Sequence, residues 1–199
     1  MLGPGCPKTM FYCTWLTHMI HWTFYSTTGN VCASLTSSVT IGFVLGLFKG
    51  RIFSKLNSVS EKIRFIKRNY LLAFLSTLGL ALCATPKLAE LLGNPTLLAA
   101  FATLFAGLVA SAIAFPFYQL PTIVSSAIFP NSSAVSLSLL EATAFFSTAP
   151  ILTANSAILG RYGWTASWTF MAIIFGMGGT LMMSAMPSVL TKAQQETDP

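Results

Sequence analysis

The sequence predicts an all-α, multi-pass membrane protein with six transmembrane helices, and three observations lead to this fold class. Of its 199 residues, 54% are hydrophobic and only 8% are charged, which leaves too little polar surface to cover a soluble core. The apolar stretches are continuous and are long enough for helices of about 20 residues, the length that crosses the hydrocarbon of a bilayer. Because these runs do not alternate between polar and apolar residues, they predict helices rather than a transmembrane barrel.

Proline, glycine, asparagine and charged residues divide the apolar sequence into its predicted spans. Pro116 and Pro121 are expected to interrupt the end of the fourth span, and Pro150 the middle of the fifth. A polar tail is predicted over residues 187–199, and the whole chain forms one domain. The six predicted helices cover residues 10–28, 30–48, 69–86, 95–118, 133–158 and 164–186.

The basic residues predict how the chain crosses the membrane. Basic loops resist translocation, so the segment 49–68 is predicted to be a loop on the cytoplasmic side, or on the equivalent side of an organelle, together with both termini. This scheme leaves only Lys87 and Arg161 on the opposite side. The lipid bilayer, including its anionic headgroups, is the expected partner of the basic segment, and nucleic acid is not. Seven of the eleven lysines and arginines lie in this segment: Lys49, Arg51, Lys55, Lys62, Arg64, Lys67 and Arg68.

Three predicted helices carry rows of small residues at every fourth position. Such rows allow a neighbouring helix to approach closely, and in lipid this close packing holds helices together. We therefore expect these faces to contact other helices and assign them no chemistry. The rows are Ser34, Ser38, Gly42, Gly46 and Gly50; Ala102, Ala106, Ala110 and Ala114; and Gly176, Thr180 and Ser184.

Glu141 is the only acidic residue inside a predicted span and is the leading candidate for a functional residue. A carboxylate in the membrane is costly unless it is paired or protonated, and such residues are commonly functional. The stripe that contains it is expected to face a polar cavity or another protein surface. Two roles remain open for Glu141: proton coupling or substrate binding, and structural pairing with a neighbouring helix. Steps of three and four residues place in this stripe Ser138, Glu141, Phe145, Thr148, Leu152 and Asn155.

The first predicted helix has a similar polar stripe, with His18 and His21 on one face. Cavity lining with proton or anion binding, hydrogen bonding between helices, and metal ligation are the alternatives. Metal ligation is disfavoured because a single His-x-x-His lacks further ligands at motif spacing, so we predict no metal and no cofactor. The sequence has no catalytic triad, nucleophile elbow or phosphate-binding glycine loop, and it does not predict an enzyme. The remaining members of the stripe are Thr14, Tyr25 and Thr28.

Several segments resemble those of one known family. Gly46-Leu47-Phe48-Lys49-Gly50-Arg51 follows a helix rich in small residues and leads into the basic stretch. Pro130 followed by Ser133-Ala134-Val135-Ser136-Leu137 opens a long helix, and Gly160-Arg161-Tyr162-Gly163-Trp164 forms a Gly-Trp turn. With six spans and both termini inside, the chain resembles the C-terminal half of a major facilitator superfamily transporter, most clearly over residues 116–186. Residues 139–143 are most similar to the organophosphate and sugar-phosphate exchangers.

This resemblance implies transport of a small polar or anionic solute by alternating access against a second six-helix half, which is a second copy or a separate chain. In this role Glu141 couples protons or binds substrate, His18 and His21 line the cavity, and Asn155 forms hydrogen bonds. Tyr25 and Thr148 are further candidates for the same site. The acidic residue of the loop signature is missing near Gly50, and only one half is present. The alternative is therefore a non-transporting structural subunit of a larger membrane complex.

Overall fold

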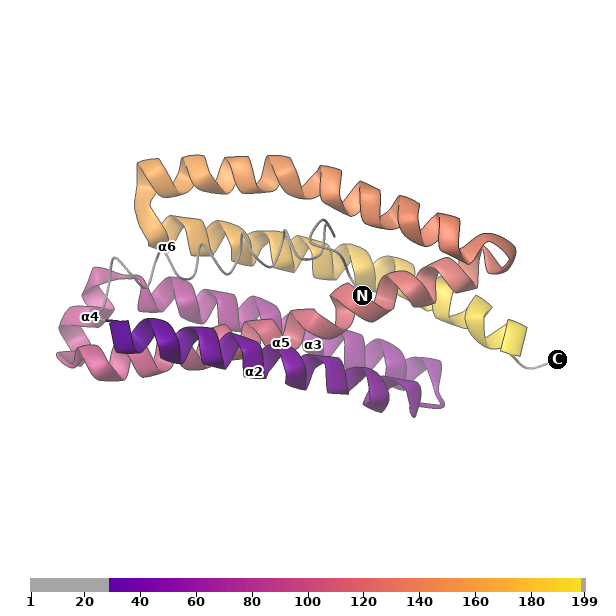
Figure 1. Ribbon diagram of the computed structural model, residues 1–199, viewed down its shortest axis with the longest axis horizontal. Helices are drawn as coiled ribbons and strands as arrows, with labels where there is room; N and C mark the ends of the chain where they lie inside the picture. Colours follow the sequence, from indigo (N-terminus) through magenta and orange to yellow (C-terminus); the bar gives the residue numbers. More distant parts are fainter. Residues whose placement is uncertain (1–28, 198–199) are drawn as a thin grey trace.

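The computed structural model describes residues 29–197, and within this range the secondary structure is entirely helical (Figure 1). Three of its helices, α2, α5 and α6, are long and apolar enough to cross a membrane, and α3 with α4, bent by 75°, forms a fourth candidate. The predicted all-helical fold is therefore confirmed, and these helices are compatible with a membrane protein. The first predicted span lies outside the described residues. The elements are α2 (Gly29–Ser54), α3 (Val59–Cys83), α4 (Pro86–Leu92), α5 (Pro95–Ile128), the 3-10 turn η1 (Pro130–Ser132) and α6 (Ser133–Thr197).

Helix α6 consists of two helical arms that meet at Gly163. The backbone there has φ 78° and ψ −174°, a conformation that is essentially restricted to glycine. The first arm (133–162) and the second arm (164–197) run back alongside each other (Figure 1), and each exceeds the roughly 20 residues that a membrane span requires. The predicted turn between Gly160 and Gly163 is confirmed at Gly163, and Gly160 remains helical.

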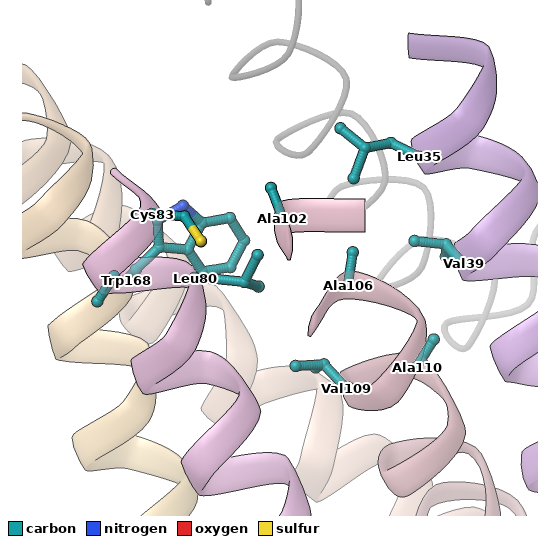
Figure 2. Close-up of a cluster of buried hydrophobic side chains, with 10 residues drawn as sticks. Leu35, Val39, Leu80, Cys83, Ala102, Ala106, Val109, Ala110 and Trp168 are labelled. Carbon is teal, nitrogen blue, oxygen red and sulfur yellow. The ribbon is translucent and has the colours of Figure 1, made fainter. Parts of the chain in front are cut away.

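Helix α5 occupies the centre of the packed helices. It contacts α2, α3 and α6, and α3 also packs against α6. Helices α2 and α3 are consecutive in the chain, but α2 packs mainly on α5 and α3 packs on both α6 and α5. Figure 2 shows this arrangement, with Leu35 and Val39 of α2 on one side of α5 and Leu80, Cys83 and Trp168 on the other.

Buried apolar side chains form two clusters at different heights along these helices. The second cluster includes an aromatic pair, in which the ring centroids of Phe53 and Phe115 are 4.9 Å apart. The first cluster contains Leu35, Val39, Leu80, Ala81, Cys83, Ala102, Ala106, Val109, Ala110 and Trp168 (Figure 2). The second contains Phe53, Ile66, Phe115, Leu120, Met186 and Leu190.

The small-residue row of α2 packs against α5, as predicted. A Cβ atom added at Gly42 would overlap the backbone carbonyl of Gly107, and one at Gly46 would lie 2.6 Å from the carbonyl oxygen of Ser111. The Ser38 Oγ donates a hydrogen bond of 2.7 Å to the Thr103 carbonyl across the same interface. The four predicted alanines of α5 are all buried. Small side chains thus bring the backbones of α2 and α5 into direct contact.

The predicted row of the last helix is only partly correct. Gly176 faces the Phe74 ring of α3, but Thr180 and Ser184 are exposed. Gly179 takes the next contact instead, where an added Cβ would lie 3.2 Å from the Tyr70 Cβ. The strict four-residue spacing therefore follows the wrong side of the second arm, because the face that packs on α3 advances by three residues at this point.

The segment 49–68, predicted as a loop, is helical except for a short turn over residues 55–58. Lysine and arginine are good helix formers, so basic sequence does not itself end a helix.

Lys192 lies beyond Leu190 of the second cluster and so is at the same end of the molecule as the turn over residues 55–58. Lys87 and Arg161 lie towards the other end, where the Thr165 hydroxyl donates to the Ala84 carbonyl at 2.9 Å. This separation of charge agrees with the predicted sidedness, which remains a prediction.

Prolines interrupt the helices less than the sequence predicts. Helix α5 continues through Pro116 and Pro121 as far as Ile128, and α6 continues through Pro150 and Pro187. The predicted helix end at residue 118 and the predicted break at Pro150 are therefore wrong. The predicted polar tail is helical over its described residues 187–197. Each proline removes one backbone donor, a loss that neighbouring helices and hydroxyl side chains compensate in membrane proteins.

The start of α5 follows the predicted signal closely. Pro95 is the first helical residue, and the Asn94 side chain accepts hydrogen bonds from the backbone N–H groups of Thr96 at 3.0 Å and Leu97 at 3.2 Å. Proline in the first turn and asparagine at the cap satisfy or remove the backbone donors that a helix leaves unpaired at its start.

Replacing Gly42 with alanine should destabilise the protein, because the new Cβ meets backbone that cannot rotate away. We expect a loss of about 1–3 kcal/mol, measured as a lower unfolding midpoint by circular dichroism in detergent. Gly178→Ala is the matched control, since an added Cβ there has no neighbour within 4 Å. A Gly42→Ala midpoint equal to that of Gly178→Ala would contradict this account of the interface.

Replacing Gly163 with alanine should destabilise the turn between the two arms by about 1–3 kcal/mol, because L-residues rarely adopt its backbone conformation. Gly160→Ala is the control: it is helical, has open space around it, and should be unchanged or stabilised by up to about 1 kcal/mol. Thermal unfolding of both variants in the same detergent checks the difference. Equal midpoints would mean that the turn does not depend on Gly163.

Candidate functional site

Three predicted site residues, Glu141, Thr148 and Asn155, lie on the first arm of α6. Their seven-residue spacing places them on one side of the helix, over about 21 Å from Glu141 to Asn155. Glu141 and Thr148 are partly buried and Asn155 is 3% exposed. On the opposite side of the arm, Leu139 is 69% and Phe146 is 74% exposed. The polar stripe is thus the less exposed side of this arm.

Thr148 and Asn155 of the stripe each take part in a hydrogen bond within the chain. The Thr148 Oγ1 donates to the Ala144 carbonyl of its own helix at 2.7 Å. The Asn155 Oδ1 accepts a hydrogen bond of 3.0 Å from the Ser167 Oγ, which lies on the second arm. Asn155 therefore links the two arms near Gly163, and its side-chain oxygen has a structural partner. Glu141 is the ionisable group of the stripe.

The other predicted site residues, His18, His21 and Tyr25, lie outside the described residues. Their place beside Glu141 and the stripe therefore remains a prediction. Among residues 29–197, no three or more histidine, cysteine, aspartate or glutamate side chains are grouped so that they could hold a metal ion.

Lys49 forms a polar contact that the sequence prediction missed. Its Nζ donates to the Asn69 Oδ1 of α3 at 2.9 Å and to the Ser111 carbonyl of α5 at 3.1 Å. The Asn69 Nδ2 in turn donates to the Phe65 carbonyl at 2.9 Å, which holds the amide in place. Asn69 and Ser111 are both buried. One ammonium group therefore connects α2, α3 and α5, and we call this contact the Lys49 bridge.

The Lys49 bridge lies between the two apolar clusters. On α5, Ser111 directly follows Ala110 of the first cluster and precedes Phe115 of the second by one turn. On α2, Lys49 lies between Val39 of the first cluster and Phe53 of the second. The bridge is therefore a polar contact between two apolar clusters, where hydrogen bonds to a charged group are strong.

Helical spacing in the sequence contains a signal for this contact. Lys49 lies three residues after Gly46 and four before Phe53, so it shares the packed side of α2 with the small-residue row. The prediction treats every basic residue of segment 49–68 as part of a loop and so does not separate Lys49 from its exposed neighbours. Arg51 and Lys55, by contrast, are exposed.

No protein family model, curated protein or solved structure matches this chain. The likeness to major facilitator transporters therefore remains an expectation from the sequence. The polar stripe of the first arm and the Lys49 bridge are the two features on which a functional proposal can be built.

Replacing Lys49 with methionine should destabilise the protein by about 1–3 kcal/mol, because it leaves the buried Asn69 and Ser111 oxygens without this donor. Lys55→Met is the matched control, since it removes an exposed lysine six residues further along the chain. The free energy of unfolding in mixed micelles measures both. The double variant Lys49→Met/Asn69→Leu should recover part of the loss, because the buried Asn69 amide is then no longer left without its donor. Equal stability of Lys49→Met and Lys55→Met would contradict the bridge.

Proposed function

We propose that this chain is one half of a major-facilitator-like transporter, which moves a small polar or anionic solute by alternating access against a second six-helix unit. The proposal rests mainly on the position of Glu141. It is a carboxyl group about 12 Å along the first arm from its start at Ser133, and it lies on the side of the arm that is less exposed than the apolar side. Acidic groups at such positions commonly bind substrate or carry protons.

The helix pattern supports a six-span unit. The two arms of α6, together with α2, α3 and α5, supply five segments longer than about 20 residues. The predicted span 10–28 would complete six and would return the N-terminus to the basic end of the molecule. In this arrangement the first arm adds Glu141, Thr148 and Asn155 to the solute path, and the first span adds His18, His21 and Tyr25.

The described residues have distinct roles in this mechanism. Glu141 exchanges a proton or contacts the solute, and Thr148 offers hydroxyl lone pairs while its proton is held by Ala144. Asn155 fixes the two arms relative to each other through Ser167. The packed group of α2, α3 and α5 then moves as one body, because the Lys49 bridge and the α2–α5 backbone contact join its members.

The Lys49 bridge also favours a second candidate, a non-transporting structural subunit of a larger membrane complex. A transporter half whose loop signature lacks the acidic residue near Gly50 has lost one switchable ion pair. In this chain Lys49, the basic residue beside Gly50, forms hydrogen bonds to the Asn69 amide and the Ser111 carbonyl. Both of these groups are neutral at all pH values. A fixed contact of this kind suits a scaffold as well as a moving half.

Glu141→Gln should reduce solute flux in proteoliposomes by at least about tenfold if the carboxyl group couples or binds. Inorganic phosphate and glycerol 3-phosphate are suitable probes, because residues 139–143 resemble organophosphate exchangers. Glu90→Gln is the control, since Glu90 is exposed on α4 and does not belong to the stripe. Equal flux of Glu141→Gln and wild type would remove Glu141 from the mechanism. Absence of flux in wild type with these and other small polar solutes would contradict the transporter.

Sizing of the purified chain in mild detergent separates the two candidates. A homodimer, or a complex with another six-helix chain, supports the transporter. Stable copurification with unrelated subunits, in fixed stoichiometry, supports the structural role.

A further inference from the structure

The outward side of α3 changes from basic to apolar along its length. Arg64 and Arg68 are exposed on its first turns, and Leu71, Leu75 and Leu82 follow with 52%, 53% and 62% exposure. Their spacing of four, three, four and seven residues places all five on one stripe of the helix. The opposite side of α3, with Ile66, Ala73 and Leu80, is buried. We call the exposed set the α3 outer stripe.

The chemistry of this stripe matches the cross-section of one bilayer leaflet. Leu75 lies about 10 Å of helix rise from Arg68, so the leucines reach acyl-chain depth when the arginines are at the headgroups. Arginine extends its guanidinium towards the interface while its methylene groups cover apolar surface. Its planar group of N–H donors also fits the oxygen atoms of a phosphate. The stripe therefore offers phosphate contacts and chain contacts in the order that a phospholipid presents them.

The surrounding charge selects among phospholipids. The segment 49–68 contains seven basic residues and a single acid, Glu61. Lys49 is engaged inside the bundle, and the Lys62 Nζ lies 6.0 Å from the centre of the Phe53 ring, so these two point towards the interior. The residues left exposed at this end include Arg64, Lys67 and Arg68. A lipid with net negative charge is attracted by this group, whereas a zwitterionic lipid gains much less.

We propose that the α3 outer stripe binds an anionic phospholipid, with its headgroup phosphate on Arg64 and Arg68 and its acyl chains along Leu71, Leu75 and Leu82. This site is separate from the polar stripe of α6 and does not depend on transport. It also gives the basic segment a specific ligand, beyond its role in setting orientation.

Native mass spectrometry of the full chain in detergent, titrated with phosphatidylglycerol or phosphatidylcholine of the same acyl chains, tests the proposal. We expect wild type to bind phosphatidylglycerol at least about fivefold more tightly. Arg64→Gln/Arg68→Gln should remove most of this preference, since each cation near anionic lipid contributes about fivefold. Lys87→Gln/Arg161→Gln is the matched control: it removes two exposed cations at the other end of the bundle and should leave the preference unchanged.

Two further measurements separate the lipid from other ligands. Leu71→Ser/Leu75→Ser should weaken phosphatidylglycerol binding while keeping both arginines, and glycerol 3-phosphate should compete poorly because it has no acyl chains. Circular dichroism should give all three double variants the helix content of wild type. Equal binding of the two lipids by wild type would overturn the proposal, as would equal losses in the arginine and control variants. Full competition by glycerol 3-phosphate, or an α3 stripe covered by a second copy of the chain, would also overturn it.

Discussion

The ammonium group of Lys49 imposes the strongest constraint on this structure. A charged group partly buried among packed helices is expensive unless its hydrogen bonds are satisfied there. Its two acceptors, on Asn69 and Ser111, belong to different helices, so both bonds form only where α2, α3 and α5 meet at one height. The bridge therefore fixes the registers of three helices together. Neither apolar cluster does this by itself, because apolar contacts tolerate sliding by a fraction of a turn more readily than a charged hydrogen bond does.

Close approach of α2 and α5 makes the bridge possible. Lys49 reaches the backbone carbonyl of Ser111, and a carbonyl already within a helix is accessible only where the neighbouring backbones are near. Gly46, one turn before Lys49, provides that proximity, since an added Cβ would lie 2.6 Å from the same carbonyl oxygen. The short Gly46 and the long Lys49 side chain are therefore both needed for this contact. The glycine brings the helices together, and the lysine uses the short distance to form a specific bond.

The sequence predicts the parts of this fold that depend on local chemistry. Asn94 and Pro95 predict the start of α5, and the glycines near residue 163 predict the turn between the arms, because caps and positive φ angles are properties of short segments. The stripe of Glu141, Thr148 and Asn155 also follows from helical periodicity. Three features could not be predicted from the sequence. They are the helical character of segment 49–68, the continuity of α5 through Pro116 and the partners of Lys49. They depend on neighbouring helices, and periodicity in one helix does not identify the helix that packs against it.

Helices α2 and α3 carry cations of two kinds, one bonded between helices and the others exposed. Arg64 and Arg68 are exposed on the outer side of α3, while Asn69, the next residue, accepts the Lys49 bond on the inner side. Consecutive residues of a helix keep a fixed spacing, so the register that the Lys49 bridge sets for Asn69 also sets the height of Arg64 and Arg68. A hydrogen bond of 2.9 Å tolerates little displacement before it weakens. The Lys49 bridge therefore fixes where along the bundle the two arginines are presented. Since the bridge also includes α5, this position is set relative to the centre of the bundle.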